Sequence, residues 1–472
     1  MISSSIASQI YTKICFKTTD NQKIIIKMLS SFISSEDKES IFILNGYAGT
    51  GKTTIISALV KTLDELGQKC VMLAPTGRAA NVLARYSGKS AQTIHKRIYQ
   101  EKNNANYQSR FVLNYKREKD TIFIVDEASM LNNTTNTGAI FGSGSLLDDL
   151  IQYVREGVRC RLIIVGDSAQ LPPVGCDFSP ALDEVTMSQY GKVVYATMDE
   201  VIRQQSDSGI LFNATLVRCM IENGIYEIPL FDLSYPDVES LEGGEFTEKL
   251  QEAYDKWGRD ETIVITRSNK RANRYNEGIR RFTLCAEEAI ESGDMLMVVR
   301  NNYHYTERLE NSPMSFIANG DVAYLSRIIR FEELYGFNFA HATMTFGDYD
   351  NTDIECRILL DTLSSESPAL STEQSEKLFR EVEQDYLDIA NRRKRLDSIR
   401  SNDHFNALQV KFSYAVTCHK AQGGQWDVVF IDRCIFGDET MTRDMLRWLY
   451  TALTRATKKV YFVNFDERFF ES

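Results

Sequence analysis

Residues 41–54 read Ile41-Phe42-Ile43-Leu44-Asn45-Gly46-Tyr47-Ala48-Gly49-Thr50-Gly51-Lys52-Thr53-Thr54. A short apolar run followed by G-x-x-x-x-G-K-T is typical of a buried strand, a glycine-rich turn and the start of a helix. In such a turn the backbone N–H groups converge on phosphate oxygens, and the helix N-terminus adds partial positive charge. The stretch therefore predicts a triphosphate-binding loop at the end of a strand in an α/β sheet.

The residues of this loop are expected to hold ATP and Mg²⁺ between them. Lys52 suits the β and γ phosphates, and Thr53 suits Mg²⁺. The nucleotide-binding set predicted in the loop is Gly46, Gly49, Thr50, Gly51, Lys52, Thr53 and Thr54. The alternative is a glycine turn that contains a lysine by chance, and the strand context and the spacing both argue against it.

A second apolar run, residues 121–125, ends in the carboxylates Asp126 and Glu127. Open α/β sheets bind their ligands at the carboxyl ends of the strands. Asp126 suits Mg²⁺, and Glu127 suits the water that attacks the phosphate. An Asp-Glu pair alone is more often a solvated strand end, but together with the phosphate loop it predicts a hydrolysis site.

Three more polar side chains are candidates for contact with the γ-phosphate. Gln170 follows the strand-like run 162–165 in a turn that two prolines make rigid. Arg203 and Arg455 each lie on a helical segment, and a guanidinium there can stabilise charge on the departing phosphoryl group, by roughly 10³ to 10⁵ in rate. The alternatives are an ordinary turn for the glutamine and surface salt bridges for the arginines.

Length and composition set the limits of these interpretations. At 472 residues the chain is too long for one core, so two or more domains are expected. The net charge of −11 argues against a uniformly basic surface that coats nucleic acid, although basic residues cluster locally. The nine cysteines lack C-x-x-C pairing, which favours reduced thiols. With no apolar membrane span and no signal-peptide pattern, we expect a soluble, cytoplasmic protein without membrane partners.

Short apolar runs recur in two groups, which predicts an α/β fold with two parallel-sheet domains. The second group is interrupted by a stretch in which turns separate short β-like runs, followed by a charged helical segment. Residues 97–120 have the pattern of a β-hairpin within the first domain. The predicted units are a first domain at 1–200, a second domain at 201–290 and 406–472, and at 291–405 an inserted small antiparallel β-barrel plus the helical segment.

The motifs follow one another in the order found in superfamily 1B helicases, and the chain resembles the RecD and Dda type most closely. They are residues 46–53, 74–80, 93–95, 126–130, 166–175, 203–204, 414–423 and 450–455. The resemblance covers nearly the whole chain. It implies two RecA-like domains and an ATP-dependent, Mg²⁺-dependent motor that moves 5′ to 3′ on single-stranded DNA and unwinds tailed duplex DNA. We further expect a monomer, with replication or repair proteins as candidate partners, although the sequence does not reveal the oligomeric state.

The resemblance assigns further roles residue by residue. Gln22 resembles the glutamine that recognises adenine, and Arg203 and Arg455 resemble the two arginines that reach the γ-phosphate from the second domain. Gly423 joins the nucleotide-binding set. The positions that resemble single-stranded DNA contacts are Pro75, Thr76, Thr93, His95, Thr417, His419 and Lys420. The two histidines could equally be packed in the core.

Some features leave alternatives open. Residues 97–120 are the candidate for the hairpin that splits the duplex, a prediction from position alone. Residues 132–145 form a loop longer than usual, and residues 366–405 match nothing in the family pattern. A different class of function, an ATPase switch that binds nucleic acid or protein without unwinding, is disfavoured by the set of nucleic-acid positions.

Overall fold

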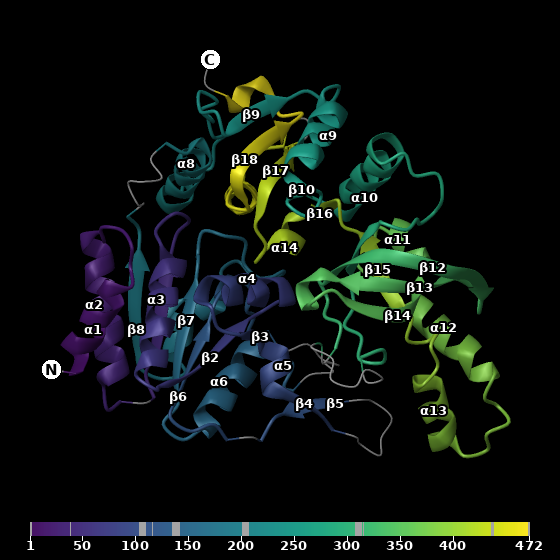
Figure 1. Ribbon diagram of the computed structural model, residues 1–472, viewed down its shortest axis with the longest axis horizontal. Coiled ribbons are helices and arrows are strands. Elements are labelled where there is room, and N and C mark those ends of the chain that lie inside the picture. Colours follow the sequence, from purple (N-terminus) through teal and green to yellow (C-terminus); the bar gives the residue numbers. More distant parts are fainter. Residues whose placement is uncertain are drawn as a thin grey trace.

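The computed structural model describes residues 2–37, 39–102, 110–115, 117–134, 142–200, 207–306, 314, 316–435 and 439–470. Figure 1 shows three parts: a first lobe around one sheet, a second lobe above it, and a barrel to the right. The α/β fold class with two parallel sheets and a barrel is confirmed. In the described residues no helix is both long enough and apolar enough to span a membrane.

The first lobe is built on a six-stranded parallel sheet in the order β3-β2-β6-β7-β1-β8. Its central strands are apolar and wholly buried because helices cover both faces. The strands are β1 (Ile41–Gly46), β2 (Lys69–Ala74), β3 (Ala91–Thr93), β6 (Thr121–Val125), β7 (Arg161–Gly166) and β8 (Val193–Met198). The helices are α1 (Ile2–Thr12), α2 (Asp20–Ser34), α3 (Lys52–Glu65), α4 (Gly77–Ser87), α5 (Ile94–Ile98), α6 (Leu146–Glu156) and α7 (Glu184–Ser188).

The second lobe carries a five-stranded parallel sheet in the order β16-β10-β17-β18-β9. The strands are β9 (Val238–Leu241), β10 (Thr262–Thr266), β16 (Ala415–Thr417), β17 (Trp426–Asp432) and β18 (Ala456–Val463). The helices are α8 (Gly209–Asn223), α9 (Phe246–Trp257), α10 (Asn269–Gly278), α14 (Cys418–Ala421) and α15 (Arg443–Leu453). The core of this lobe takes in Ala169 and Leu171 of the first lobe, so the lobes share apolar packing beside the end of β7.

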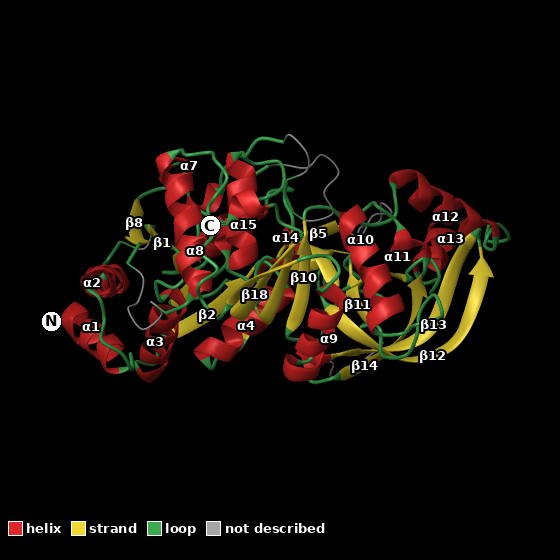
Figure 2. Cartoon of the chain, turned by 90° about the horizontal axis from the view of Figure 1, so that it is seen from above, coloured by secondary structure: helices red, strands yellow, loops and turns green. Residues whose placement is uncertain are grey.

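The inserted part is a closed five-stranded barrel, visible on the right of Figures 1 and 2. Its strands are β11 (Met295–Val298), β12 (Val322–Leu334), β13 (Phe337–Phe346), β14 (Thr352–Leu359) and β15 (Leu408–Phe412). All neighbouring pairs are antiparallel except β14 with β15, which is parallel. Because β15 closes the barrel, the barrel continues past residue 405, where the sequence analysis ended the insertion.

Three helices lie between β14 and β15: α11 (Asp361–Ser364), α12 (Thr372–Gln384) and α13 (Arg392–Arg400). The last two form a helical pair whose buried residues Leu378, Val382 and Ile399 pack on Phe337 and Phe339 of β13. The predicted helical segment is therefore packed against the barrel.

The predicted hairpin of the first lobe contains an antiparallel pair of strands, β4 (Tyr99–Lys102) and β5 (Arg110–Leu113). Residues 103–109 between them lie outside the described residues, as do residues 135–141 of the long loop. From β5 the Phe111 ring lies 4.8 Å from the Tyr303 ring, which in turn lies 4.9 Å from the Phe316 ring. This aromatic row joins the hairpin to the inserted part.

Candidate nucleotide and nucleic-acid sites

The phosphate loop joins β1 to α3 at the carboxyl end of the first sheet. Gly49 and Gly51 adopt φ values of 73° and 88°, which favour glycine, and Gly51 is the N-cap of α3. A Cβ on Gly46 would stand 2.6 Å from Cγ of Lys52. The loop therefore needs glycine at these positions to bring its backbone N–H groups around an anion at the start of α3.

Lys52 is the first residue of α3 and its side chain lies along the loop. Its Nζ donates to the carbonyl oxygens of Gly46 and Tyr47, the second at 3.0 Å. The same Nζ lies 4.0 Å from Oδ2 of Asp167, a carboxylate only 1% exposed. A nucleotide would draw the ammonium group away from these partners towards its phosphates.

Asp126 and Glu127 follow β6 directly, beside the phosphate loop. Burial, with the neighbouring Glu127 charge, raises the pKa of Asp126. Glu127 has a φ of 52°, a left-handed conformation that costs a non-glycine residue on the order of 1 kcal/mol. A divalent cation would favour the ionised form of Asp126, so the chemistry of this acid suits a metal ligand.

Gln170 and Arg455 are buried polar residues that come from different lobes. Gln170 is 5% exposed, and its Oε1 is buried without a hydrogen-bond partner among the described residues. Arg455 is 3% exposed, and its Nη1 lies 4.0 Å from Oε1 of Glu127 across the interface between the lobes. Its guanidinium also donates to the Gly424 carbonyl at 3.2 Å. Arg203 lies outside the described residues.

Gln22 supports the phosphate loop from α2. Its Nε2 donates to the Thr50 carbonyl at 2.8 Å, and its Oε1 accepts from the Thr19 N–H at 3.0 Å. Thr19 and Gln22 form a capping box at the start of α2, and Gln22 is 1% exposed. Its amide therefore braces the loop. The T-x-x-Q spacing was visible in the sequence but did not enter the prediction, which assigned Gln22 to adenine.

Several of the predicted nucleic-acid residues begin helices. The hydroxyls of Thr76 and Thr93 cap α4 and α5, accepting from Ala79 N and Lys96 N at 3.2 Å each. Pro75 precedes Thr76 in the turn after β2. Backbone N–H groups at such helix starts suit phosphate oxygens.

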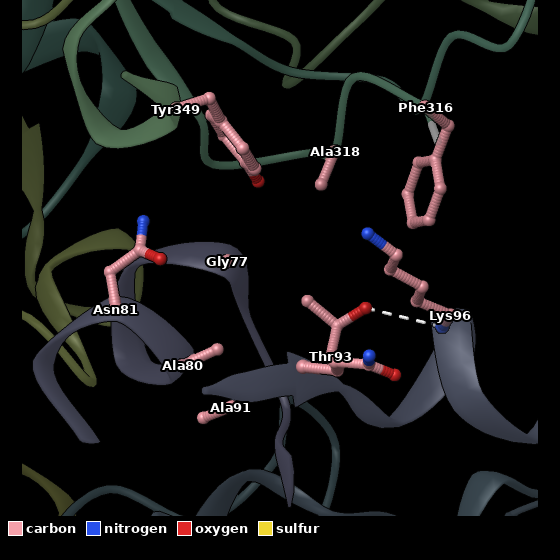
Figure 3. Close-up of a pocket in the computed structure, with 10 residues that line it drawn as sticks. Gly77, Ala80, Asn81, Ala91, Thr93, Lys96, Phe316, Ala318 and Tyr349 are labelled. Carbon is pink, nitrogen blue, oxygen red and sulfur yellow. Dashed lines mark hydrogen bonds between the residues drawn. The ribbon is translucent and has the colours of Figure 1, made fainter. Parts of the chain in front are cut away.

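A cavity opens between these helices and the inserted part (Figure 3). It is lined by Gly77, Ala80, Asn81, Ala91, Gln92, Thr93, Lys96, Phe316, Ala318 and Tyr349. The Lys96 side chain points into it from the first lobe, towards the Phe316 ring. The cavity thus combines a cation with an aromatic face. Of its lining residues, Gly77 and Ala80 lie in the motif at 74–80, and only Thr93 was predicted to contact nucleic acid. The position of Lys96 directly after His95 was the available signal.

The remaining predicted contacts gather around α14 and α5. Thr417 is the N-cap of α14, and Lys420 donates to Oδ1 of Asn319 at 2.5 Å. Burial lowers the pKa of His95 to about 4, so this imidazole is neutral at pH 7. Burial also lowers the pKa of His419. These histidines can therefore hydrogen-bond or stack, but they bring little charge.

Gly423 lies at a close approach of the two lobes. Its φ is 74°, and a Cβ there would stand 2.8 Å from Cβ of Ala79 and 3.4 Å from Oγ1 of Thr76. Both neighbours belong to α4 or its cap, which also carries predicted nucleic-acid contacts. Its nucleotide role stays a prediction.

Two family models match the chain. A model described as an AAA domain matches residues 26–218, and one described as a UvrD-like helicase C-terminal domain matches residues 412–463. The chain is 28% identical to the ATP-dependent RecD2 DNA helicase of Deinococcus radiodurans over 36% of this chain. It is 29% identical to the ATP-dependent DNA helicase dda of Enterobacteria phage T4 over 33% of this chain. In both parts the chain is therefore similar to helicases, including the RecD and Dda type.

The matches to these two helicases cover only part of each relative. The matches cover 21% of the Deinococcus protein and 33% of the phage protein. An uncharacterized protein of Acanthamoeba polyphaga mimivirus is 22% identical over 94% of this chain and 99% of its own length. The crystal structure of a Pif1 helicase from Bacteroides with ADP-AlF3 and ssDNA has a TM-score of 0.48 and 15% identity, covering 97% of this chain and 95% of that one.

Proposed function

We propose that this chain is an ATP-dependent DNA helicase that moves 5′ to 3′ on single-stranded DNA and opens tailed duplex DNA. The observation that carries the proposal is the approach of Arg455 to within 4.0 Å of Glu127. A cation of the second lobe thereby faces a candidate catalytic acid of the first. We call this interface between the lobes, at Arg455 and Glu127, the seam. Hydrolysis at the seam would depend on how the two lobes are arranged, and a motor requires such a dependence.

The residues of the seam fit ATP and Mg²⁺. Thr53 and Asp126 would hold the ion, which supplies charge neutralisation on the phosphates. The nucleotide would be held by Gly46, Gly49, Thr50, Gly51, Lys52, Thr53 and Thr54, with Gln22 and Gly423 as the further members of the predicted set. Glu127 would accept a proton from the attacking water, and Oε1 of Gln170, which no described residue bonds, suits a hydrogen bond from that water. Arg455, with Arg203 as its predicted companion, would stabilise the departing phosphoryl charge.

The predicted nucleic-acid residues lie on both lobes and suit the binding of single-stranded DNA. Thr76 and Thr93 at helix starts offer phosphate contacts, and Lys96 with Phe316 adds a cation and a stacking face. The further contacts of the proposal are Pro75, His95, Thr417, His419 and Lys420. Such contacts carry no base readout, so binding is expected to be salt-sensitive and tolerant of sequence.

The proposal also covers how the duplex is split, where the protein acts and in which direction it moves along DNA. The antiparallel pair β4–β5 within residues 97–120 would split the duplex, and the barrel would cover the strand. The protein would act as a monomer in the cytoplasm, with replication or repair proteins as partners. Movement 5′ to 3′ is consistent with the superfamily 1B relatives.

The test pairs strand displacement with ATP hydrolysis. Lys52→Ala is expected to abolish DNA-stimulated hydrolysis and unwinding, because the phosphates lose their cation. Lys61→Ala, an exposed lysine on the same helix, is the matched control and should retain both. A duplex with only a 5′ single-stranded tail should be opened. Unwinding by Lys52→Ala would refute the motor, preference for a 3′ tail would refute the direction, and hydrolysis without displacement would indicate a switch.

A further inference from the structure

We propose that Tyr450 is a positioning residue for ATP hydrolysis, whose hydroxyl couples the closing of the two lobes to the phosphate loop and to Lys52. This inference rests on the proposed function. Tyr450 belongs to α15 of the second lobe, and none of the roles assigned above falls on it. Its contacts reach two nucleotide-site segments of the first lobe at once.

The Tyr450 hydroxyl accepts a hydrogen bond from the Ala48 N–H of the phosphate loop at 2.9 Å. It donates to Oδ2 of Asp167 at 2.7 Å. The side chain is 1% exposed, and burial raises its pKa, so the phenol stays protonated and can donate. Both partners of one buried hydroxyl therefore lie in the other lobe.

Asp167 links this hydroxyl to the loop lysine. Its Oδ1 accepts from Ala169 N at 3.0 Å, while its Oδ2, the oxygen bonded by Tyr450, lies 4.0 Å from Nζ of Lys52. A carboxylate oxygen that already accepts a hydrogen bond attracts a nearby ammonium group less strongly. With the lobes closed, Asp167 should hold Lys52 more weakly, which leaves the lysine available to the phosphates. With the lobes apart, Asp167 should hold Lys52 more tightly.

Two neighbours of Tyr450 on α15 also bond to the first lobe. Thr451 accepts from the Leu171 N–H at 2.9 Å, and Arg447 donates to the Asp177 carbonyl at 2.5 Å. Both bonds cross to the chain that follows β7. In this arrangement three residues of α15, Arg447, Tyr450 and Thr451, all bond to the first lobe. When the lobes part, α15 moves away with the second lobe, so the Tyr450 bonds should form only when the lobes close.

The chain contains a matched control for removal of the hydroxyl. Tyr414 is also 1% exposed, and its hydroxyl accepts from Met295 N at 3.1 Å and donates to Oδ1 of Asp294 at 3.0 Å. Those partners lie at the start of the barrel, away from the seam. Tyr450→Phe and Tyr414→Phe therefore delete the same chemical group from the same kind of environment, and both keep the ring that fills the core.

The experiment compares steady-state ATP hydrolysis, with saturating single-stranded DNA, in wild type and both variants. Tyr450→Phe should lower kcat by roughly tenfold to a hundredfold, as expected for loss of a buried hydrogen bond to a charged group, with the ATP KM changed less than threefold. Tyr414→Phe should keep the wild-type kcat. Equal kcat in wild type and Tyr450→Phe would overturn the inference, and so would an equal fall in both variants.

Two further measurements keep the inference testable without relying on turnover alone. Amide hydrogen exchange in the nucleotide-free protein should show lost protection at Ala48 in Tyr450→Phe but not in Tyr414→Phe; unchanged protection overturns the contact. Asp167→Asn should make the later addition of Tyr450→Phe cost less than threefold, whereas fully multiplicative losses would overturn action through Asp167. Wild type without DNA-stimulated hydrolysis would instead count against the proposed function.

Discussion

Gly423→Ala should separate the lobes without unfolding them. The added methyl would stand 2.8 Å from Cβ of Ala79, closer than carbon atoms pack, and the residue would keep a φ of 74° that disfavours alanine. Ala79 is 3% exposed on α4, so it has little room to yield. The least costly response is for the second lobe to withdraw from α4.

The size of the effect follows from two contributions. The left-handed backbone costs on the order of 1 kcal/mol for a residue with a side chain. Overpacking by one methyl costs about 1 to 3 kcal/mol. The backbone cost lowers the stability of the folded chain whether the lobes are closed or open. Only the overpacking falls on the closed arrangement alone, and about 1 to 3 kcal/mol would lower its population relative to the open one by roughly 5-fold to 140-fold.

The assay is kcat for DNA-stimulated ATP hydrolysis beside the free energy of unfolding in urea. Two glycines of the second lobe serve as controls, since a Cβ on either would meet no atom of the described part of the chain within 4 Å. Gly258→Ala has a φ of 89° and tests the backbone cost alone, while Gly244→Ala tests neither cost. Gly423→Ala should lower kcat about fivefold or more below both controls. Wild-type kcat in Gly423→Ala, with a stability loss like that of Gly258→Ala, would refute the reasoning.

Three other substitutions test separate parts of the structure. Burial raises the pKa of Asp321 to about 7, above an ordinary value of 3.8, so the folded state holds a proton that the unfolded state has lost between these two values. Thermal unfolding should therefore show wild type losing stability between about pH 4 and 7 relative to Asp321→Asn, with little further change above that range. Gln22→Ala removes the donor to the Thr50 carbonyl and should weaken ATP binding about fivefold to tenfold in a fluorescent-nucleotide titration; unchanged affinity would exclude a bracing role. Tyr303→Ala breaks the ring contacts with Phe111 and should lower strand displacement more than ATP hydrolysis; equal falls would argue against the aromatic row as part of the unwinding apparatus.

Local patterns in the sequence were enough to predict the sheets and the barrel. Long buried strands such as Ile41–Gly46 are continuous apolar runs, so they stood out. Ala91–Thr93 and Ala415–Thr417 are three-residue strands, too short for any periodicity to show. The end of the barrel was placed too early because Leu408–Phe412 pairs with strands distant in sequence, and no local signal reports such pairing.

The residues of the candidate site also differ in how far the sequence could predict them. Lys52 and Asp126 were found because motif and strand context lie within a few residues of one another. Tyr450 was not assigned a role, because its partner Ala48 is 402 residues away and only folding brings them together. Gln22 shows a third case, since its capping box was readable but a single glutamine can both cap a helix and contact a ligand, and sequence alone does not rank the two.

Two linked helices, α14 and α15, relate the candidate nucleotide site to the candidate nucleic-acid surface. The Cys418 thiol of α14 donates to the Trp448 carbonyl of α15 at 3.6 Å, so the helix that carries His419 and Lys420 is tied to the helix that carries Tyr450. Helices are stiff along their length, so a change that frees Tyr450 from the phosphate loop should displace α14 as well. Lys420 also donates to Asn319 of the inserted part, and the preceding residue, Ala318, lines the cavity in Figure 3, so the displacement should reach that cavity. Under the proposed function, loss of the γ-phosphate between the lobes should therefore change how the protein holds a DNA strand. The change would pass through the contacts of α15, α14 and the inserted part.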